Sequence, residues 1–379
     1  MRICVAYDCL YPYTVGGAEA WYRAVAERLA AAGHDVTYIT LRQWPYDHEP
    51  DLPGVRVVAV APRMSLYTES GRRKILPPLV FGLGALKHLL FGPRYDVVHM
   101  ASFPYFSVLA AALARPLRRF RLVIDWHEVW TREYWDEYLG PLGRVGWAVQ
   151  TLCARVAHRA FCFSRLHAQR LRDEGFRGEV TILEGQYVPQ SHPPPQPPVR
   201  IQPLAVFAGR HIPEKRTPAV VTAVKAALPN WPDLRCVIYG DGPERDQVER
   251  LVAELGLAGV VRVPGFAASE ELQEALSRAT CMVLPSRREG YGRIVIEAAA
   301  VGTPSVVVAD PDNAATELIK EGVNGVIAAS AEPYDVAAAM LRVRDAGQPL
   351  RDSTAAWFEQ NVRRLSVETS LEHVTGSYA

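Results

Sequence analysis

The residues best suited to chemistry lie in one fifteen-residue run, Ser286 to Ala300, which reads SRREGYGRIVIEAAA. An apolar strand is expected to end just before it, at Pro285, and an apolar helix to begin near Gly292. Glycines let the backbone approach a ligand closely, and the start of a helix offers free N–H groups and a partial positive charge. The run therefore predicts an anion-binding turn between a strand and a helix.

Two carboxylates accompany this turn. Glu289 lies in the loop and Glu297 near the second helical turn, so both can face a ligand at that helix end. Carboxylates accept paired hydrogen bonds from vicinal hydroxyls, such as those of sugars. A glycine pair alone would favour an ordinary turn with exposed glutamates, whereas the full run favours a binding site.

Two cations have the spacing of a phosphate clamp. Arg210 and Lys215 follow an expected strand at 204–208 and lie five residues apart in one loop. Arginine offers a forked donor and lysine a point charge. Taken alone, the two would be ordinary surface cations, and Arg216 is a neighbouring candidate for the same role.

One histidine follows a strand end in the first half. His127 comes directly after an expected strand at 122–126 and is flanked by Trp126 and Glu128. A lone histidine is more often structural, but its place at a strand end makes a functional role equally well supported.

Short β-branched runs alternate with amphipathic stretches along the whole chain, which predicts an α/β fold with doubly wound parallel sheets. The expected strands in the first half are 2–7, 36–40, 55–60, 96–100, 122–126, 160–164 and 180–183. Those in the second half are 204–208, 235–239, 260–263, 281–285, 304–308 and 325–328.

A proline-rich stretch separates the two halves. Seven prolines between positions 189 and 203 exclude a helix or a central strand and favour a stiff extended spacer. We therefore expect a Rossmann-like domain at 1–188, a linker at 189–203, a second such domain at 204–355, and a C-terminal helix at 356–379 that packs back on the first domain. Two domains of this kind facing each other would leave a ligand-binding cleft between them.

The composition restricts the class of protein. The 379 residues are 49% hydrophobic and 22% charged, with a formal net charge of +1, which excludes a mostly disordered chain and makes a non-specific nucleic-acid binder improbable. Six scattered cysteines without a C-x-x-C pair predict reduced, buried thiols in a cytosolic protein. The N-terminus is interpreted as a first strand rather than a signal peptide, and no convincing membrane span is found.

In the order of its motifs the chain resembles the GT-B glycosyltransferases, in particular the large retaining group known as family four. The resemblance covers nearly the whole chain and rests on six blocks: Gly16-Gly17-Ala18-Glu19, Trp126-His127-Glu128, Gly209-Arg210 with Glu214-Lys215, Gly240-Asp241-Gly242-Pro243, Gly265-Phe266, and E-G-x-G-x-x-x-x-E from Glu289 to Glu297 followed by Ala300-x-Gly302-x-Pro304. It implies a GT-B fold of two Rossmann-like domains facing across a cleft. It also implies a UDP- or GDP-sugar type of donor and no cofactor or bound metal.

The resemblance implies site residues as well. The implied catalytic residues are His127, Arg210, Lys215 and Glu289. The implied donor-binding residues are Gly16, Gly17, Gly265, Phe266, Gly290, Tyr291, Gly292, Arg293, Ile294 and Glu297. In these roles the cations neutralise the diphosphate, the amides of Arg293 and Ile294 hold its distal phosphate, and Glu297 holds the ribose. Glu289 binds the transferred sugar, and Gly265-Phe266 lies beside the base.

The implied reaction is a hexosyltransferase-like transfer, with retention, to a saccharide, lipid-linked or small-molecule hydroxyl. Negative charge develops on the leaving phosphate, so preplaced positive charge is needed, and we name no general base. Asp310-Pro311-Asp312 has the D-x-D pattern of metal sites in the other glycosyltransferase architecture, although Asp-Pro and Asp-Asn are also strong turn signals. The loop at 310–315 and the segment Leu183-Glu184-Gly185-Gln186 depart from the family pattern.

Two other classes of function stay open. A related GT-B enzyme, such as an epimerase or a phosphorylase, would share the fold; a pyridoxal-phosphate phosphorylase would need a Schiff-base lysine, for which only Lys215, Lys225 and Lys320 are available in the second half. A non-catalytic sugar-nucleotide-binding or scaffold protein would keep the fold and lose the site cluster.

Residues 72–91 join a basic start to a long apolar stretch, and further arginines follow at 115, 118, 119 and 121. This composition suits peripheral binding to an anionic membrane, and it equally suits a core-facing helix with a basic cap. The expected localisation is cytoplasmic, with peripheral contact at the inner membrane face as the further hypothesis.

Overall fold

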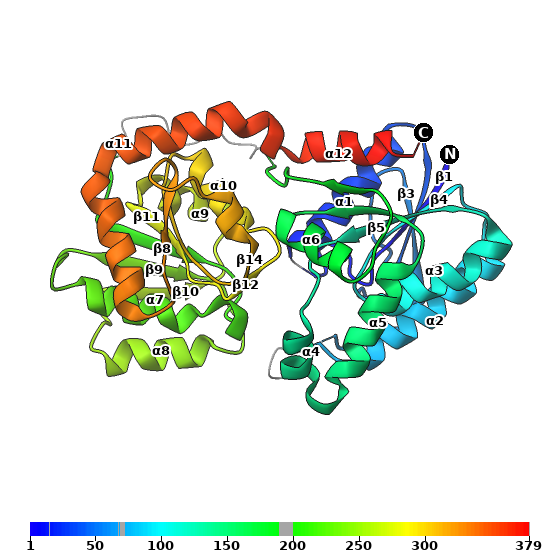
Figure 1. Ribbon diagram of the computed structural model, residues 1–379, viewed down its shortest axis with the longest axis horizontal. Coiled ribbons are helices and arrows are strands. Elements are labelled where there is room, and N and C mark those ends of the chain that lie inside the picture. Colours follow the sequence, from blue (N-terminus) through cyan, green and yellow to red (C-terminus); the bar gives the residue numbers. More distant parts are fainter. Residues whose placement is uncertain (15, 67, 69–72, 189–199, 379) are drawn as a thin grey trace. The chain divides into compact units, whose positions relative to one another are not determined.

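The computed structural model describes residues 1–14, 16–66, 68, 73–188 and 200–378 (Figure 1). The chain divides into two compact units. Unit 1 comprises Met1–Thr68, Arg72–Glu184 and Glu368–Ala379, and unit 2 comprises Gly185–Val367. Most of the expected linker, at 189–199, lies outside the described residues. The expected domain end at 355 falls inside a helix, and the division comes at 367/368 instead.

Unit 1 is built on a parallel seven-stranded sheet in the order β3-β2-β1-β4-β5-β6-β7. Val5 at its centre pairs with Tyr38 on one side and His99 on the other. The strands are β1 (Arg2–Ala6), β2 (Asp35–Leu41), β3 (Val55–Ala61), β4 (Val97–Ala101), β5 (Arg121–Trp126), β6 (Arg159–Cys162) and β7 (Val180–Ile182). All five residues of β4 are buried, as expected for a parallel strand covered on both faces.

Helices cover both faces of this sheet. They are α1 (Gly17–Ala31), α2 (Leu76–Phe91), α3 (Tyr105–Arg118), α4 (Arg132–Leu139), the short η1 (Gly140–Leu142), α5 (Gly143–Arg155), α6 (Arg165–Asp173) and α12 (Val367–Gly376). One buried core cluster contains residues of α2, α3, α5 and α6 together with strand residues, so these four helices share one face of the sheet. The last residues belong to unit 1: Tyr378 is 1% exposed and its hydroxyl bonds the ring of His99.

Unit 2 has a parallel six-stranded sheet in the order β10-β9-β8-β11-β13-β15. Its strands are β8 (Leu204–Ala208), β9 (Arg235–Tyr239), β10 (Val261–Gly265), β11 (Cys281–Leu284), β13 (Ser305–Val308) and β15 (Gly325–Ala328). A separate parallel pair joins β12 (Arg288–Glu289) to β14 (Asp312–Asn313). The helical segments are η2 (Pro213–Lys215), α7 (Thr217–Ala227), α8 (Arg245–Glu254), α9 (Ser269–Arg278), α10 (Arg293–Ala300), η3 (Ala314–Leu318) and α11 (Pro333–Leu365).

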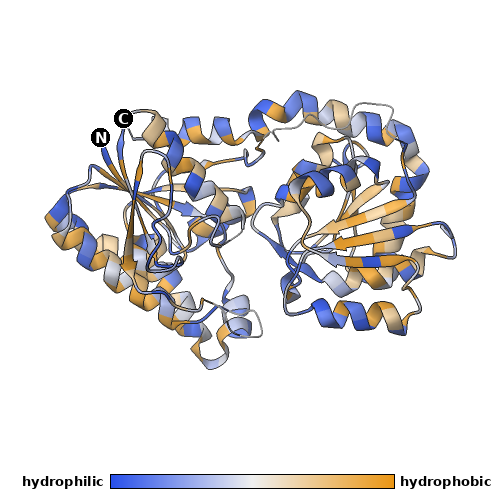
Figure 2. Cartoon of the chain, turned by 180° about the vertical axis from the view of Figure 1, so that it is seen from behind, coloured by the Kyte–Doolittle hydropathy of each residue, from blue (hydrophilic) through white to orange (hydrophobic). Residues whose placement is uncertain are grey.

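The strand expectations are confirmed. Each of the thirteen expected strands occurs, with ends within two residues, and the strands of both sheets are strongly hydrophobic (Figure 2). The β12–β14 pair was not expected, because two-residue strands carry no periodic pattern. The six cysteines are buried free thiols, as expected. Within the described residues no helix combines the length and the apolar character needed to cross a bilayer.

Candidate functional site

Backbone hydrogen bonds at three glycines connect the carboxyl ends of neighbouring strands in unit 2. The N–H of Gly209 after β8 donates to the carbonyl of Tyr239 (3.1 Å), and the N–H of Gly240 after β9 donates to that of Gly265 in β10 (2.8 Å). Gly240 has a φ of 118°, and a Cβ there would lie 1.8 Å from the Gly209 carbonyl oxygen. Only glycine fits this approach, so the Gly209, Gly240 and Gly265 motifs form one continuous edge.

The loop that carries the two candidate cations is tied down on both sides. The N–H of His211 donates to the Asp241 carbonyl (2.9 Å), and the N–H of Arg287 donates to the Glu214 carbonyl (2.8 Å). These bonds connect the loop after β8 to the loops after β9 and β11. Within it Arg210 is exposed, whereas Lys215 ends the 3-10 turn η2 and is half-buried.

Lys215 and Glu289 meet although they are 74 residues apart in sequence. The ammonium of Lys215 forms an ion pair with Oε1 of Glu289, which also accepts a hydrogen bond from the Ser286 hydroxyl (2.7 Å). The Glu289 side chain is 9% exposed and that of Lys215 is 20% exposed. An ammonium has three donors, so Lys215 can hold Glu289 and still donate to a phosphate oxygen.

The turn before α10 is fixed by a residue that the sequence did not single out. Asn313 donates through Nδ2 to the carbonyls of Ser286 (3.1 Å) and Val308 (2.9 Å), and its Oδ1 accepts from the Ala315 N–H (3.1 Å). Because Asn313 belongs to β14, these bonds and the β12–β14 pairing hold the Ser286–Glu289 loop against the 310–315 loop. The sequence pattern predicts only a turn at Asn313.

Gly292 turns the chain into α10. Its φ is 103°, a left-handed conformation that disfavours other residues, and a Cβ there would lie 2.6 Å from the Cβ of Ala315. Arg293 and Ile294 form the first helical turn, where N–H groups have no partner within the helix. The expected helix start is therefore confirmed, and Gly290 and Tyr291 lie in the turn that leads to it.

Glu297 lies one helical turn further on and is held by its own helix. Arg293 Nη2 contacts Glu297 Oε1 at 3.2 Å, with both side chains partly exposed. Glu297 also lines a small cavity of about 30 Å³ together with Tyr187 and Gln273. Directly after β10, Phe266 is 72% exposed, so its ring is accessible.

The D-x-D segment is engaged in a different contact. Asp310 pairs with Arg216 at 3.1 Å, and the N–H of Asp312 donates to Asp310 Oδ1 (3.3 Å). The adjacent side chains of Arg216 and Lys215 therefore have different partners, since Lys215 pairs with Glu289. In the described part of the chain no group of three or more His, Cys, Asp or Glu residues has the arrangement of a metal site.

His127 lies in unit 1, directly after β5. Its ring stacks on Phe163, with centroids 4.4 Å apart and planes 3° from parallel, and Tyr22 lies edge-on at 5.8 Å. Burial lowers the pKa of His127, although Asp125 and Glu128 oppose the shift. Its Nε2 is buried and has no hydrogen-bond partner among the described residues. A neutral imidazole with one unused nitrogen is suited to a hydroxyl group.

Beneath His127 lies a polar network that sequence reasoning missed. Asp125 accepts hydrogen bonds from the His99 ring (2.7 Å) and from the Trp21 indole (2.7 Å), and all of these side chains are buried. Burial opposes ionisation of Asp125, but the charge and hydrogen bond of His99 hold its pKa below its usual range. Because His99 also bonds Tyr378, the network joins four distant segments, a pattern no local motif reveals.

The remaining predicted residues, Gly16 and Gly17, begin α1 of unit 1. Gly16 is in an extended conformation with φ of −177°, so its role is not backbone strain. A Cβ on Gly16 would lie 2.3 Å from Oε2 of Glu19, so a side chain there would displace the glutamate.

Comparison with family models gives a match in each half of the chain. Residues 15–184 match Glycosyltransferase Family 4, and residues 193–356 match Glycosyl transferases group 1. The two matches follow the order expected from the sequence motifs.

Curated relatives match over different parts of the chain. The alpha-D-kanosaminyltransferase of Streptomyces kanamyceticus is 30% identical over 144 residues, which is 38% of this chain and 37% of that protein. The GDP-mannose-dependent alpha-mannosyltransferase of Corynebacterium glutamicum is 24% identical over 86% of this chain and 76% of its own length. The first of these relatives is thus matched over little more than a third of its length.

Solved structures resemble the whole chain in fold. Sucrose-phosphate synthase from Thermosynechococcus elongatus superposes with a TM-score of 0.79 at 19% identity, covering 100% of this chain and 98% of that one. HepE from Anabaena, solved in complex with UDP-glucose, has a TM-score of 0.76 at 17% identity, with coverage of 100% and 99%. With two parallel α/β units and a family match in each half, the chain belongs to the GT-B glycosyltransferases of the family-four type.

Proposed function

We propose that this protein is a retaining, hexosyltransferase-like enzyme that moves a sugar from a nucleoside-diphosphate sugar to a hydroxyl acceptor. The observation that carries the proposal is the cluster of Lys215, Glu289 and Ser286 in the loops at the carboxyl ends of the unit 2 strands. The start of α10 follows one of these loops. Together the cluster and the helix start combine positive charge, helix amides and carboxylates, which are the groups that a sugar nucleotide requires.

In the proposed reaction the bond from the anomeric carbon to the diphosphate oxygen breaks while a bond to the acceptor oxygen forms on the same face. The acceptor proton passes to the leaving phosphate, so no side chain is assigned as general base. Charge that develops on the phosphate would be stabilised by Arg210, by Lys215 and by the amides of Arg293 and Ile294. No metal ion is needed in this scheme, because these groups supply the positive charge.

The hydroxyl groups of the donor would be held by the carboxylates. Glu297 would bind the ribose, with Arg293 fixing its position, and Glu289 would bind the transferred sugar while Lys215 and Ser286 orient it. In unit 1, the unused Nε2 of His127 would contact a sugar hydroxyl. Phe266 would stack on the base, and Gly16 and Gly17 would leave room for the diphosphate and the acceptor.

The relatives support the class of donor. One relative is named as GDP-mannose-dependent and another as a kanosaminyltransferase, and HepE has been solved with UDP and glucose. We propose a UDP- or GDP-sugar as donor and a saccharide, a lipid-linked sugar or a small molecule as acceptor. We also propose that the enzyme works in the cytoplasm.

A panel of sugar nucleotides tests the proposal. Thermal shifts with UDP, GDP, dTDP and ADP identify the base, and incubation with the matching sugars then measures release of the nucleoside diphosphate. We expect one nucleotide to stabilise the protein, and its sugar to be hydrolysed slowly or transferred. NMR of the product should show the anomeric configuration of the donor. If no nucleotide binds, the enzyme assignment is wrong; an inverted product would contradict retention alone.

A further inference from the structure

Three helices of unit 1 turn one side toward the sheet, and their other side is exposed among the described residues. α2 packs on α3, and α3 also contacts α5. Their inner sides are in the core cluster, which contains Ala85 and Leu89 of α2, Val108 of α3, and Cys153 and Ala154 of α5. The core-helix interpretation of 72–91 is therefore correct for the inner side of α2 only.

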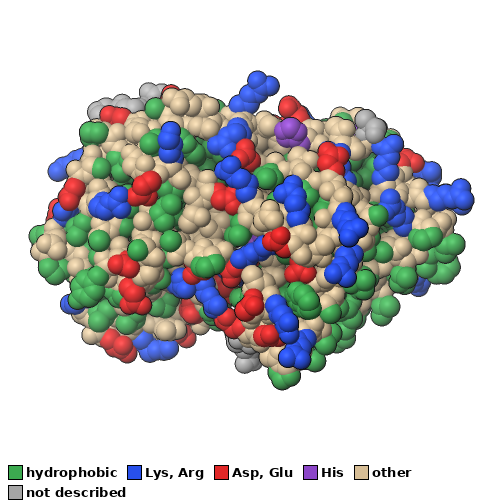
Figure 3. All heavy atoms as spheres, viewed as in Figure 1, with side chains coloured by type: hydrophobic (Ala, Val, Ile, Leu, Met, Phe, Trp, Pro, Cys, Tyr) green, Lys and Arg blue, Asp and Glu red, His purple; other side chains and the backbone are tan. Residues whose placement is uncertain are grey.

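The outer sides of the same helices are apolar. On α2 the exposed residues follow helical spacing at positions 76, 79, 83, 87 and 91, and four of these are Leu or Phe. Leu83 is 70% exposed, Phe91 82% and Leu117 71%. Of the sixteen large hydrophobic residues that are exposed in the described chain, eight lie on these three helices: Leu76, Leu79, Leu83, Phe91, Leu113, Leu117, Val145 and Leu152. Figure 3 shows hydrophobic side chains gathered over α2 and α5.

The charged residues within these helices are all cations, and the carboxylate of Glu174, which bonds to α5, accepts from Trp147 and Thr151. α2, α3 and α5 contain no Asp or Glu, and they carry the cations Lys87, Arg115, Arg118, Arg144 and Arg155. Exposed Lys74, Arg94 and Arg119 flank them. By contrast, α8 of unit 2 carries Asp and Glu as well as Arg. We call the exposed sides of α2, α3 and α5 the basic–apolar face.

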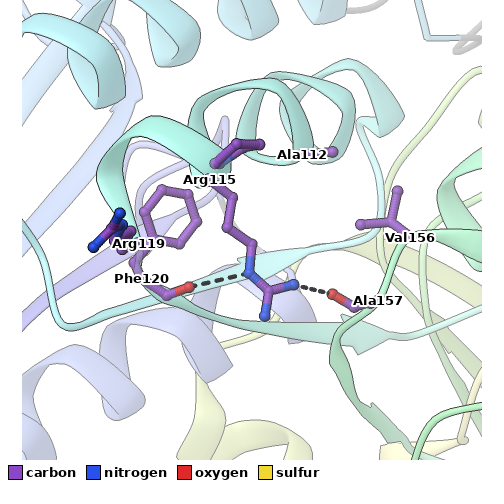
Figure 4. A pocket seen from close by; sticks show the side chains of 7 residues that line it. Ala112, Arg115, Arg119, Phe120, Val156 and Ala157 are labelled. Carbon is purple, nitrogen blue, oxygen red and sulfur yellow. Dashed lines mark hydrogen bonds between the residues drawn. The ribbon is translucent and has the colours of Figure 1, made fainter.

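An open depression of about 550 Å³ adjoins the ends of α3 and α5 (Figure 4). Two arginines line it. Arg115 is fixed in the wall, because its Nε donates to the Phe120 carbonyl (3.2 Å) and its Nη1 to the Ala157 carbonyl. Arg119, the C-cap of α3, is exposed at the rim. The guanidinium group of Arg119 and the Nη2 group of Arg115 are donors of the kind that a phosphate ester accepts.

We propose that the basic–apolar face docks on a bilayer containing anionic lipids, with a lipid phosphate in the arginine-lined depression. Leu and Phe side chains would enter the headgroup boundary while the surrounding cations meet the negative surface, the pattern of an interfacial protein surface. A second copy of this chain is a poorer occupant, because a symmetric contact would place the cations of this face against themselves. The inference rests on the proposed function in one respect: docking would give the enzyme access to a lipid-linked acceptor.

Flotation with vesicles tests the docking directly. The probes are vesicles of pure phosphatidylcholine and vesicles with about 30 mol% phosphatidylglycerol. We expect the protein to float with the anionic vesicles at low salt, to float much less in about 0.5 M salt, where charges are screened, and to float poorly with the neutral ones. Absence of flotation with anionic vesicles at low salt would overturn the proposal.

Matched variants locate the surface. We expect Leu83→Ser with Phe91→Ser, and separately Lys87→Glu with Arg119→Glu, each to weaken binding at least about tenfold, since these anchors and cations meet the membrane. The controls are Tyr334→Ser and Arg250→Glu, which change equally exposed residues of unit 2 and should bind like the wild type. Face variants that float normally would overturn the proposal, as would a face variant that only converts a dimer into a monomer.

Donor turnover in solution separates this inference from the proposed function. The face variants should release nucleoside diphosphate at the wild-type rate, because none of the four residues belongs to the donor site. A protein that floats but uses no sugar nucleotide contradicts the enzyme assignment alone. One that turns over its donor but never floats contradicts only the docking.

Discussion

The two units use charge differently. In unit 2, the ion-paired side chains of Lys215, Arg216 and Arg293 are 20%, 30% and 35% exposed, and each belongs to a loop or a helix start. In unit 1, the side chains of His99 and Asp125 are fully buried. Partly exposed pairs can exchange a partner for a substrate, whereas a buried pair that loses a partner leaves an uncompensated charge. Unit 2 therefore has partly exposed ion pairs of the kind that the proposed function requires, whereas the buried pair of unit 1 stabilises the fold.

The largest effect should come from breaking the buried network in unit 1. Replacing Asp125 by alanine leaves His99 and the Trp21 indole without their acceptor, so we expect a loss of about 3–5 kcal/mol in the free energy of unfolding. Calorimetry would show this as a lower melting temperature of unit 1. Asp35→Ala is the control: it breaks an exposed pair with Arg56 and should cost less than about 1 kcal/mol. Equal losses in the two variants would remove the contrast.

Acid should weaken unit 1 through its buried histidines. Burial lowers the pKa of His158 from 6.5 to about 4. Below pH 6.5 the unfolded state binds a proton that the folded state does not bind. The free energy of unfolding therefore decreases as the pH is lowered from 6.5 to the folded-state pKa, by about 3 kcal/mol in total. Denaturation curves between pH 7 and pH 4 measure the slope. A His158→Gln variant with an unchanged slope would show that another group is responsible.

An intermediate effect is expected for the exchangeable pairs of unit 2. Lys215→Ala and Glu297→Ala should each weaken donor binding or turnover by about 1.5–3 kcal/mol, the value of a charged hydrogen bond. That corresponds to roughly tenfold to more than a hundredfold. Arg216→Ala is the matched control, because Arg216 is engaged by Asp310 and is not assigned to the donor. Wild-type kinetics in both test variants would withdraw the two assignments, and a loss in the Arg216 variant alone would transfer the role to Arg216.

The smallest effect is expected from chelation. If the cations and helix amides of unit 2 alone compensate the leaving phosphate, EDTA should leave the turnover rate unchanged. A rate measurement before and after metal removal, with Mg²⁺ added back, is sufficient. Strict metal dependence would instead assign a role to Asp310 and Asp312. It would also show that the cations and amides of unit 2 do not compensate the phosphate charge alone.

Local sequence signals account for most of the fold and for part of the site. Hydrophobic runs predicted the thirteen strands, and glycine spacing predicted the turn into α10, because both depend on nearby residues. Other features of the site could not be predicted in this way. The Lys215–Glu289 pair and the Asp125 network join residues 26 to 279 positions apart, and Asn313 acts by bonding backbone carbonyls. Such contacts leave no periodic trace in one sequence. The outer side of α2 was visible in composition, but its continuation over α3 and α5 required the packing.

A crystal soaked with the nucleoside diphosphate that best stabilises the protein tests the central claim most directly. The account predicts a diphosphate between Arg210, Lys215 and the first turn of α10, with the ribose hydroxyls on Glu297. A nucleotide bound elsewhere, or bound with Lys215 still engaged only by Glu289 and out of reach of phosphate, would contradict it.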